Sequence, residues 1–151
     1  MNSQSQIIFQ TLLALILGGL IGLEREYKRK EAGLQTYSLV SLGSCLFTII
    51  CFELVNFYTG ESNINIDPTR IIQAIAIGIG FIGAGVIFHR PSRIEGLTTA
   101  AGLWTTAAVG IAIGSGFYFL AIFGTLLAIV ILFGFGFLEK KIFKEKFPKL
   151  E

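Results

Sequence analysis

The stretch IIQAIAIGIGFIGAGVIF, residues 71–88, carries glycines 78, 80 and 83 in the pattern G-x-G-x-x-G, which is typical of dinucleotide-binding loops. Such a loop needs a strand before the glycines, a turn at them and a helix after them. Here the pattern lies inside one apolar run that only Gln73 interrupts, and no turn residue precedes it. The stretch therefore predicts a membrane helix whose small residues let neighbouring helices approach closely, and not a phosphate-binding loop.

The composition of the chain agrees with this interpretation. Of its 151 residues, 53% are hydrophobic and 15% are charged, and the mean hydropathy is +0.72. Soluble domains carry about 25% charged residues, and one bilayer crossing takes about 20 apolar residues. We therefore predict an all-α polytopic membrane protein with about five transmembrane helices. The predicted spans contain no Lys or Arg and cover residues 7–23, 36–57, 71–88, 97–113 and 117–138.

The basic residues predict the orientation of these spans, because short loops rich in Lys and Arg stay cytoplasmic. With the N-terminus outside and the C-terminus cytoplasmic, 11 of the 12 basic residues lie inside, and only Arg70 lies outside. The chain then divides into a transmembrane domain, residues 1–138, and a basic cytoplasmic tail, residues 139–151, that rests on anionic headgroups. The net charge of +2 reflects this topology, and we expect no nucleic-acid partner.

The residues that could carry out catalysis are kept apart by this topology. His89 ends the third predicted span on the inner side, and Ser115 lies on the outer side between the last two spans. A hydrolase needs such a pair within hydrogen-bond reach, but the hydrocarbon core of about 30 Å separates them. Cys45 and Cys51 do not face each other on a helix and are expected to be packing residues. We expect no enzyme activity and no cofactor.

Glu53 is the one acidic residue inside a predicted span. Ionisable residues within spans are candidates for a function. Glu53 lies about one turn from the outer end of its span, so the sequence leaves open whether it is functional or part of the solvated edge.

A first stretch rich in charge, GGLIGLEREYKRKEAGLQT, covers residues 18–36. Gly18 and Gly22 form a G-x-x-x-G step, which predicts that another helix packs closely just before Glu24, Arg25 and Glu26. These charged residues form either an ion or partner site or a plain cytoplasmic anchor.

A second stretch, DPTRIIQ at residues 67–73, is typical of a helix start. Asp67 is predicted to be the N-cap and Pro68 to occupy the first helical position. Capping does not explain Arg70, which we expect to pair with Asp67 one turn away.

The fourth predicted span has small and hydroxyl residues at three- and four-residue steps, which predicts one narrow packing face formed by Thr98, Ala101, Gly102, Thr105, Val109 and Ala112. Four threonines either line a polar path or bond to their own helix, which is the commoner role of threonine in a span: Thr98, Thr99, Thr105 and Thr106. Trp104 lies about 10 Å into the span, too deep for an interfacial belt. It is expected to fill a gap between helices or, in the alternative, to gate a cavity. Gly80, Gly83 and Ala84 of the third span are expected to form another packing surface, within the fold or in a homodimer.

These stretches carry a resemblance to a known family. GLEREYKRKEAGLQT, LVSLGSCLFT, DPTRIIQAIAIGIGFIGAGVIF and GLTTAAGLWTTAAVGIAIGSGFY follow one another along residues 22–118. They closely resemble the membrane domain of the MgtC/SapB family, and the likeness covers roughly residues 12–118. The family's shared residues map onto Gly22, Glu24, Arg25, Glu26, Gly33, Asp67, Arg70, Gly80, Gly83, Gly85, Gly96, Thr98, Thr99, Trp104 and Thr105.

The resemblance implies a multi-pass protein of the bacterial cytoplasmic (inner) membrane that is linked to growth when magnesium is scarce. Older names call some members magnesium-transport ATPase proteins, but this chain has no G-x-x-x-x-G-K-[ST] loop. The better-studied virulence members are thought to act on other membrane proteins, including the ATP synthase. Many members carry a soluble C-terminal domain, whereas this chain is similar to the short form.

Two functions remain open from the sequence. The first is a non-enzymatic regulator of membrane partner proteins or of ion balance during magnesium limitation. The second is a small oligomeric cation transporter or channel, in which Glu24, Glu26 or Asp67 would serve entry sites through hard oxygen ligands. Besides the lipid bilayer, we expect a second copy of the chain as partner, with a dimer favoured, and another membrane protein for the regulator. No metal ligand set is assigned.

Overall fold

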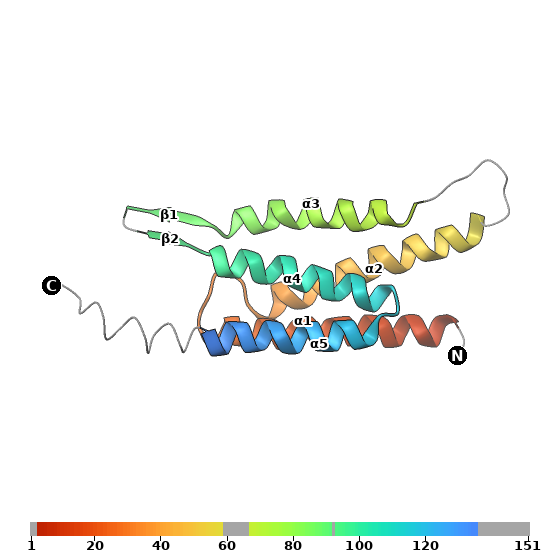
Figure 1. The fold of residues 1–151 in the computed structure, drawn as a ribbon, viewed down its shortest axis with the longest axis horizontal. Coiled ribbons are helices and arrows are strands. Elements are labelled where there is room, and N and C mark those ends of the chain that lie inside the picture. The colour runs from red at the N-terminus through yellow and green to blue at the C-terminus, as the bar shows by residue number, and fades with distance from the viewer. Residues whose placement is uncertain (1–2, 59–66, 92, 136–151) are drawn as a thin grey trace.

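The computed structural model describes residues 3–58, 67–91 and 93–135. Successive helices run in opposite directions along one long axis (Figure 1). The chain order is α1 (Ser3–Tyr27), α2 (Leu34–Tyr58), α3 (Thr69–Gly85), β1 (Phe88–Arg90), β2 (Arg93–Glu95), α4 (Leu97–Gly114) and α5 (Tyr118–Val130), which continues as the π-helical turn η1 (Ile131–Phe135). The predicted tail at residues 139–151 lies outside the described residues.

The helices confirm the all-α membrane class. Helices α1, α2, α4 and the combined α5–η1 are each long and apolar enough to cross a membrane. Helix α3 is also apolar but has 17 residues, which corresponds to about 25 Å at 1.5 Å per residue. The predicted G-x-G-x-x-G glycines all lie within α3, so the segment is helical where a nucleotide-binding fold would need a turn.

The third predicted span was too long at its C-terminal end. Helix α3 ends at Gly85, and Phe88 belongs to an antiparallel hairpin in which it pairs with Glu95. Arg90 Nε donates to Glu95 Oε2 across this hairpin at 2.8 Å. Strands of three residues are too short to give an alternating pattern in the sequence, which is why the hairpin was missed.

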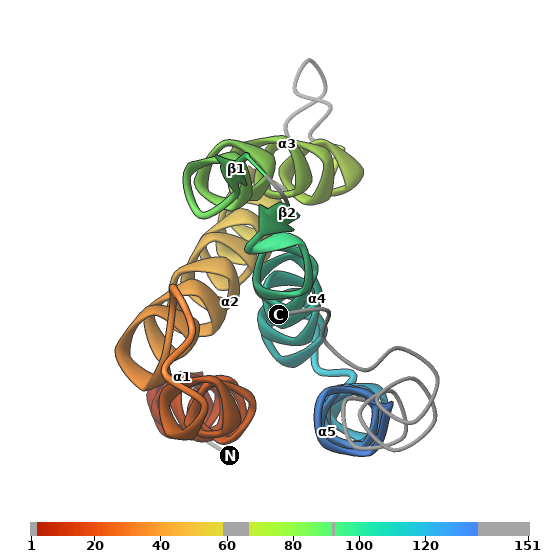
Figure 2. The same cartoon turned by 90° about the vertical axis from the view of Figure 1, so that its left-hand side faces the viewer.

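Helix α4 is the centre of the bundle (Figure 2), and it contacts each of the other four α-helices. This position makes the packing face wider than the sequence predicted. Gly102, Val109 and Ala112 are buried as predicted, but most of the rest of α4 is buried too. The narrow face is the exposed one, which carries Leu97, Ala101, Trp104 and Ala108.

Trp104 and two threonines therefore differ from their predicted positions. Trp104 is 56% exposed, so it neither fills a gap between helices nor gates a cavity of this chain. Thr98 is exposed and Thr105 half-buried, while their neighbours Thr99 and Thr106 are buried. The packed face is wider than predicted and leaves out Thr98 and Ala101, because small residues occur on both sides of this helix and either side could pack.

Glycines bring the backbones of α1, α2 and α4 close together. A Cβ on Gly18 would lie 2.6 Å from Ser41 Cβ, and one on Gly22 would lie 2.7 Å from Tyr37 Cβ. On α4, a Cβ on Gly114 would lie 2.7 Å from Thr48 Cβ. These distances leave no space for any side chain, so α2 packs between α1 and α4 at backbone contact.

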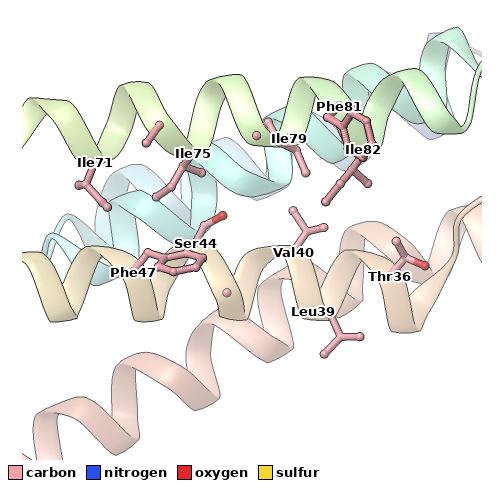
Figure 3. A pocket seen from close by; sticks show the side chains of 13 residues that line it. Thr36, Leu39, Val40, Ser44, Phe47, Ile71, Ile75, Ile79, Phe81 and Ile82 are labelled. Carbon is pink, nitrogen blue, oxygen red and sulfur yellow. The ribbon is translucent and has the colours of Figure 1, made fainter.

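Helix α3 packs more loosely than the sequence predicted. Gly83 faces α4, where its Cβ would lie 3.5 Å from Ala100 Cβ. Nothing lies within 4 Å of a Cβ on Gly80, and Ala84 is exposed, so these two residues do not pack within the chain. The helix turns Ile79 and Gly83 inward instead. Between α2 and α3 runs an apolar groove of about 660 Å³, lined on its two sides by residues such as Phe47 and Ile75 (Figure 3).

Candidate functional site

Two oppositely charged side chains are buried at the C-terminal end of α1. Glu24 is 1% exposed and Arg25 is 3% exposed. Arg25 Nε donates a hydrogen bond to Glu24 Oε2. A solvated cytoplasmic anchor does not describe these residues, because both side chains are almost fully buried where α2 approaches α1 closely at Gly22.

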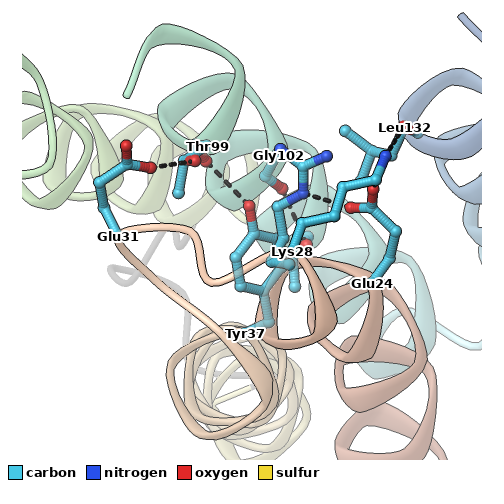
Figure 4. Close-up of polar contacts among 9 residues, drawn as sticks. Glu24, Lys28, Glu31, Tyr37, Thr99, Gly102 and Leu132 are labelled. Carbon is cyan, nitrogen blue, oxygen red and sulfur yellow. Dashed lines mark hydrogen bonds and ion pairs between the residues drawn. The ribbon is translucent and has the colours of Figure 1, made fainter. Parts of the chain in front are cut away.

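Lys28 completes a charged cluster with Glu24 and Arg25. Its Nζ lies 2.5 Å from Glu24 Oε1 and donates to the backbone oxygen of Leu132 at 3.1 Å (Figure 4). The same Nζ lies 5.3 Å from the centre of the Phe133 ring. The cluster therefore joins the end of α1 to η1. Sequence reasoning counted Lys28 only as a topology signal, although its spacing of one turn from Glu24 indicates an ion pair.

A second chain of hydrogen bonds joins the loop after α1 to α2 and α4. Tyr37 Oη donates to the backbone oxygen of Thr99 at 3.0 Å, and Thr99 Oγ1 donates to Glu31 Oε2 at 2.7 Å (Figure 4). The hydrogen bond from Thr99, supported by a backbone hydrogen bond, lowers the pKa of the Glu31 carboxyl. Gly102 makes room for Tyr37, because a Cβ there would lie 2.5 Å from Tyr37 Oη. No sequence pattern pointed to Tyr37, since one tyrosine in an apolar span is not distinctive.

Glu26 and Gly33 have a structural role beside this cluster. Glu26 is exposed, and its Oε2 accepts a hydrogen bond from the backbone N–H of Leu34 at 3.2 Å. This carboxylate satisfies a free N–H at the start of α2. A side chain on Gly33 would overlap the Glu26 carboxylate. These contacts give Glu26 a role that requires no ligand.

Asp67 and Arg70 lie at the opposite end of the bundle, where α3 begins (Figure 1). Asp67 Oδ1 accepts hydrogen bonds from the backbone N–H of Thr69 at 2.9 Å and from Thr69 Oγ1 at 2.7 Å. The helix begins at Thr69 with Pro68 as its N-cap residue, one position later than predicted, so Asp67 precedes the cap and still bonds to the first helical N–H. These bonds lower the pKa of Asp67. The predicted pair with Arg70 is not formed, because the carboxylate is directed to Thr69. The structure does not bring this pair of residues together with Glu24 and Arg25.

The remaining candidates do not form a ligand site. Thr105 Oγ1 donates to the backbone oxygen of Ala101 at 3.0 Å, so it bonds to its own helix. Cys45 and Cys51 are free and buried, and Glu53 is exposed. Among the described residues, no three His, Cys, Asp or Glu side chains lie close enough to hold a metal ion.

The region that contains both polar groups also carries a family signature. The model of the MgtC family matches residues 11–141. The chain belongs to the MgtC family. This finding confirms the resemblance and, with the apolar helices, identifies a multi-pass membrane protein.

Relatives of this MgtC-family chain occur in distant bacteria. An uncharacterized protein of Haemophilus influenzae is 45% identical over 132 residues, which cover 85% of this chain and 56% of the relative. The Escherichia coli protein YhiD, named as a candidate magnesium transporter, is 42% identical over 128 residues, or 85% of this chain and 60% of YhiD. Protein SapB of Bacillus subtilis is 41% identical over 126 residues, or 83% of this chain and 54% of SapB. The chain thus spans little more than half the length of these relatives. No solved structure matches it.

Proposed function

We propose that this chain is a non-enzymatic protein of the bacterial inner membrane that regulates membrane partner proteins or ion balance during magnesium limitation. The observation that carries the proposal is the close packing of α2 against α1 and α4. These helices meet at backbone contact through Gly18, Gly22 and Gly114, which leaves no ion path between α1 and α2 or between α2 and α4.

The buried hydroxyl groups support the same conclusion. Thr48, Thr106 and Thr125 each donate to a backbone oxygen four residues earlier in their own helix, at 2.8 Å. Their hydrogen-bonding capacity therefore serves the helices. Mg²⁺ usually keeps several of its waters when it binds to protein, and a hydrated ion needs more room than these contacts leave.

The charged end of the bundle offers a surface for a partner. Arg29 and Lys30 are exposed after α1, and the exposed residues His89 and Arg90 lie in the hairpin at the same end (Figure 1). The buried cluster of Glu24, Arg25 and Lys28 fixes the helix ends beneath this surface. Under the predicted topology this end is cytoplasmic, where basic residues gather.

A small cation transporter is the second candidate, favoured by the name of the relative YhiD as a candidate magnesium transporter. In that case the path would lie between two or more copies of the chain. The face of α3 that carries Gly80 and Ala84 is open in the single chain and could pack against a second copy.

Growth at low magnesium tests the proposal. The double variant Glu24→Gln with Arg25→Gln should impair growth more than Asp67→Asn, because it removes the buried ion pair that holds the helix ends beneath the partner surface. Asparagine still caps a helix, so Asp67→Asn preserves the start of α3. The comparison requires equal amounts of each protein in the membrane. Equal loss from both variants, together with ion flux through the unmodified protein, would favour the transporter.

A further inference from the structure

Arg25 has hydrogen-bond donors that the protein does not use. Its side chain is 4% exposed, and its Nε donates to Glu24. A guanidinium also carries N–H donors on its two terminal nitrogens, and these have no acceptor among the residues that the structure describes. Among the described residues, the fully buried side-chain atoms that lack a hydrogen-bond partner are Glu24 Oε1 and Ser41 Oγ. The terminal nitrogens of Arg25 also lack a partner but are not in this set, so they are not fully buried and reach the surface.

The surroundings of Arg25 favour an anion. Lys28 shares the single carboxylate of Glu24 with Arg25, so these three side chains carry one surplus positive charge. Helix α4 starts at Leu97 without a side-chain cap, and the free N–H groups of a helix start attract anions. The Glu31 carboxylate already occupies part of this region, bound to Thr99 in the first turn of α4. Glu31 forms no ion pair with Arg25, whose terminal nitrogens stay available.

The position of Arg25 relative to the membrane indicates which anion it would meet. The candidate span of α1 extends to Tyr27, so Arg25 lies in its last turn, near the level of the lipid headgroups. Leu23 is 56% exposed on the same turn, and Phe133 beside Lys28 is 48% exposed. A charged cluster with apolar side chains around it suits a phosphate group at the boundary between headgroups and acyl chains.

We propose that Arg25, together with Lys28 and the first turn of α4, binds a phosphate group, supplied by an anionic lipid headgroup or by free phosphate. The paired donors of a guanidinium match two oxygens of a phosphate, which a lysine ammonium cannot do. The site would exist whether the protein regulates a partner or conducts an ion, so its test is independent of the proposed function.

Thermal unfolding in a detergent that contains no phosphate tests the site. The purified protein is compared in dodecyl maltoside micelles, in the same micelles with added phosphatidylglycerol, and in the same micelles with inorganic phosphate or with chloride at equal ionic strength. A higher unfolding midpoint with phosphatidylglycerol identifies the headgroup as the source, and one with inorganic phosphate identifies the free ion. Arg25→Lys keeps the charge but loses the paired donors, and it should weaken binding about tenfold or more.

Lys30→Gln is the matched control, because it removes an exposed charge close to the site. This variant should keep the shift in midpoint that Arg25→Lys loses. A shift that Arg25→Lys retains in full, or no shift with either phosphate source, overturns the proposal. If Arg25→Lys does not fold, the unmodified protein alone tests the site. Phosphatidylglycerol that stays bound at high ionic strength, or phosphate that binds saturably there, supports the site. Loss of both shows that the attraction is non-specific and overturns the proposal.

Discussion

Glu24 is the residue on which the charged cluster depends. Its two carboxylate oxygens face Arg25 Nε and Lys28 Nζ, and its side chain has no exposed surface. Removing one partner of a buried ion pair costs about 3–5 kcal/mol, because the other charge is left uncompensated. Removing both partners costs less than the sum of the single changes.

We therefore expect Glu24→Gln to lower the free energy of unfolding strongly, and Glu24→Gln with Arg25→Gln to cost less than the two single changes added together. Glu53→Gln is the control, because Glu53 is exposed on α2 and its replacement should change stability by less than about 0.5 kcal/mol. Thermal unfolding of the wild type, the two single variants, the double variant and the control in one detergent provides the comparison. Strictly additive losses would show that Glu24 and Arg25 do not act as a pair.

Glu31 gives the protein a stability that depends on pH. Its pKa in the folded protein lies below the ordinary value of 4.5, chiefly because of the hydrogen bond from Thr99. The unfolded chain therefore binds the proton more tightly, and the stabilisation is complete above the ordinary pKa and disappears as the pH falls through the lowered one. Wild type should be more stable than Glu31→Gln at about pH 6, and the difference should vanish on acidification below 4.5. A difference in unfolding midpoint that is independent of pH would contradict this account.

At the scale of the helix, the contact between α1 and α2 depends on the absence of a side chain at Gly18. An added Cβ would meet Ser41 Cβ at 2.6 Å and the Tyr37 backbone oxygen at 2.7 Å. Gly18→Ala should destabilise the protein by about 1–3 kcal/mol, because the two helices must move apart. Gly80→Ala meets nothing within 4 Å and should be neutral or stabilising by up to about 1 kcal/mol, because alanine favours a helix interior. Chemical or thermal unfolding of both variants checks the pair, and equal effects would mean that the α1–α2 contact is not a tight one.

The helices differed in how well the sequence predicted them. The second predicted span, residues 36–57, agrees with α2 to within two residues at each end, because its apolar run ends in polar and charged loops. The packed face of α4 was predicted only in part: Gly102, Val109 and Ala112 are buried, but Thr98 and Ala101 are exposed. Small residues lie on both sides of the helix, and the sequence does not say how many neighbours surround it. Burial of Glu24 and Arg25 depends on the packing of other elements against the end of α1, which no local pattern contains.

For the whole molecule, the alternating helices place the loop after α1 and the hairpin at one end, and the start of α3 and the turn after α4 at the other (Figure 1). Which end faces the cytoplasm is a prediction from the basic residues. A membrane-impermeant thiol reagent applied to intact cells should modify a cysteine introduced at Ser115, in a background without Cys45 and Cys51. It should not modify one at Arg90 in the hairpin. Modification of the hairpin position in intact cells would reverse the orientation.

The central proposal for the whole molecule is that one chain regulates and does not conduct. The backbone contacts at Gly18, Gly22 and Gly114 support it, because they leave no ion path between α2 and its neighbours α1 and α4. The proposal can be tested without a partner protein. The direct measurement is Mg²⁺ entry into proteoliposomes that contain only this protein, with a magnesium-sensitive dye inside and unfolded protein removed beforehand. The account predicts entry no faster than into liposomes without protein, from a preparation that restores growth at low magnesium in cells. Saturable Mg²⁺ entry that rises with the amount of protein would contradict it.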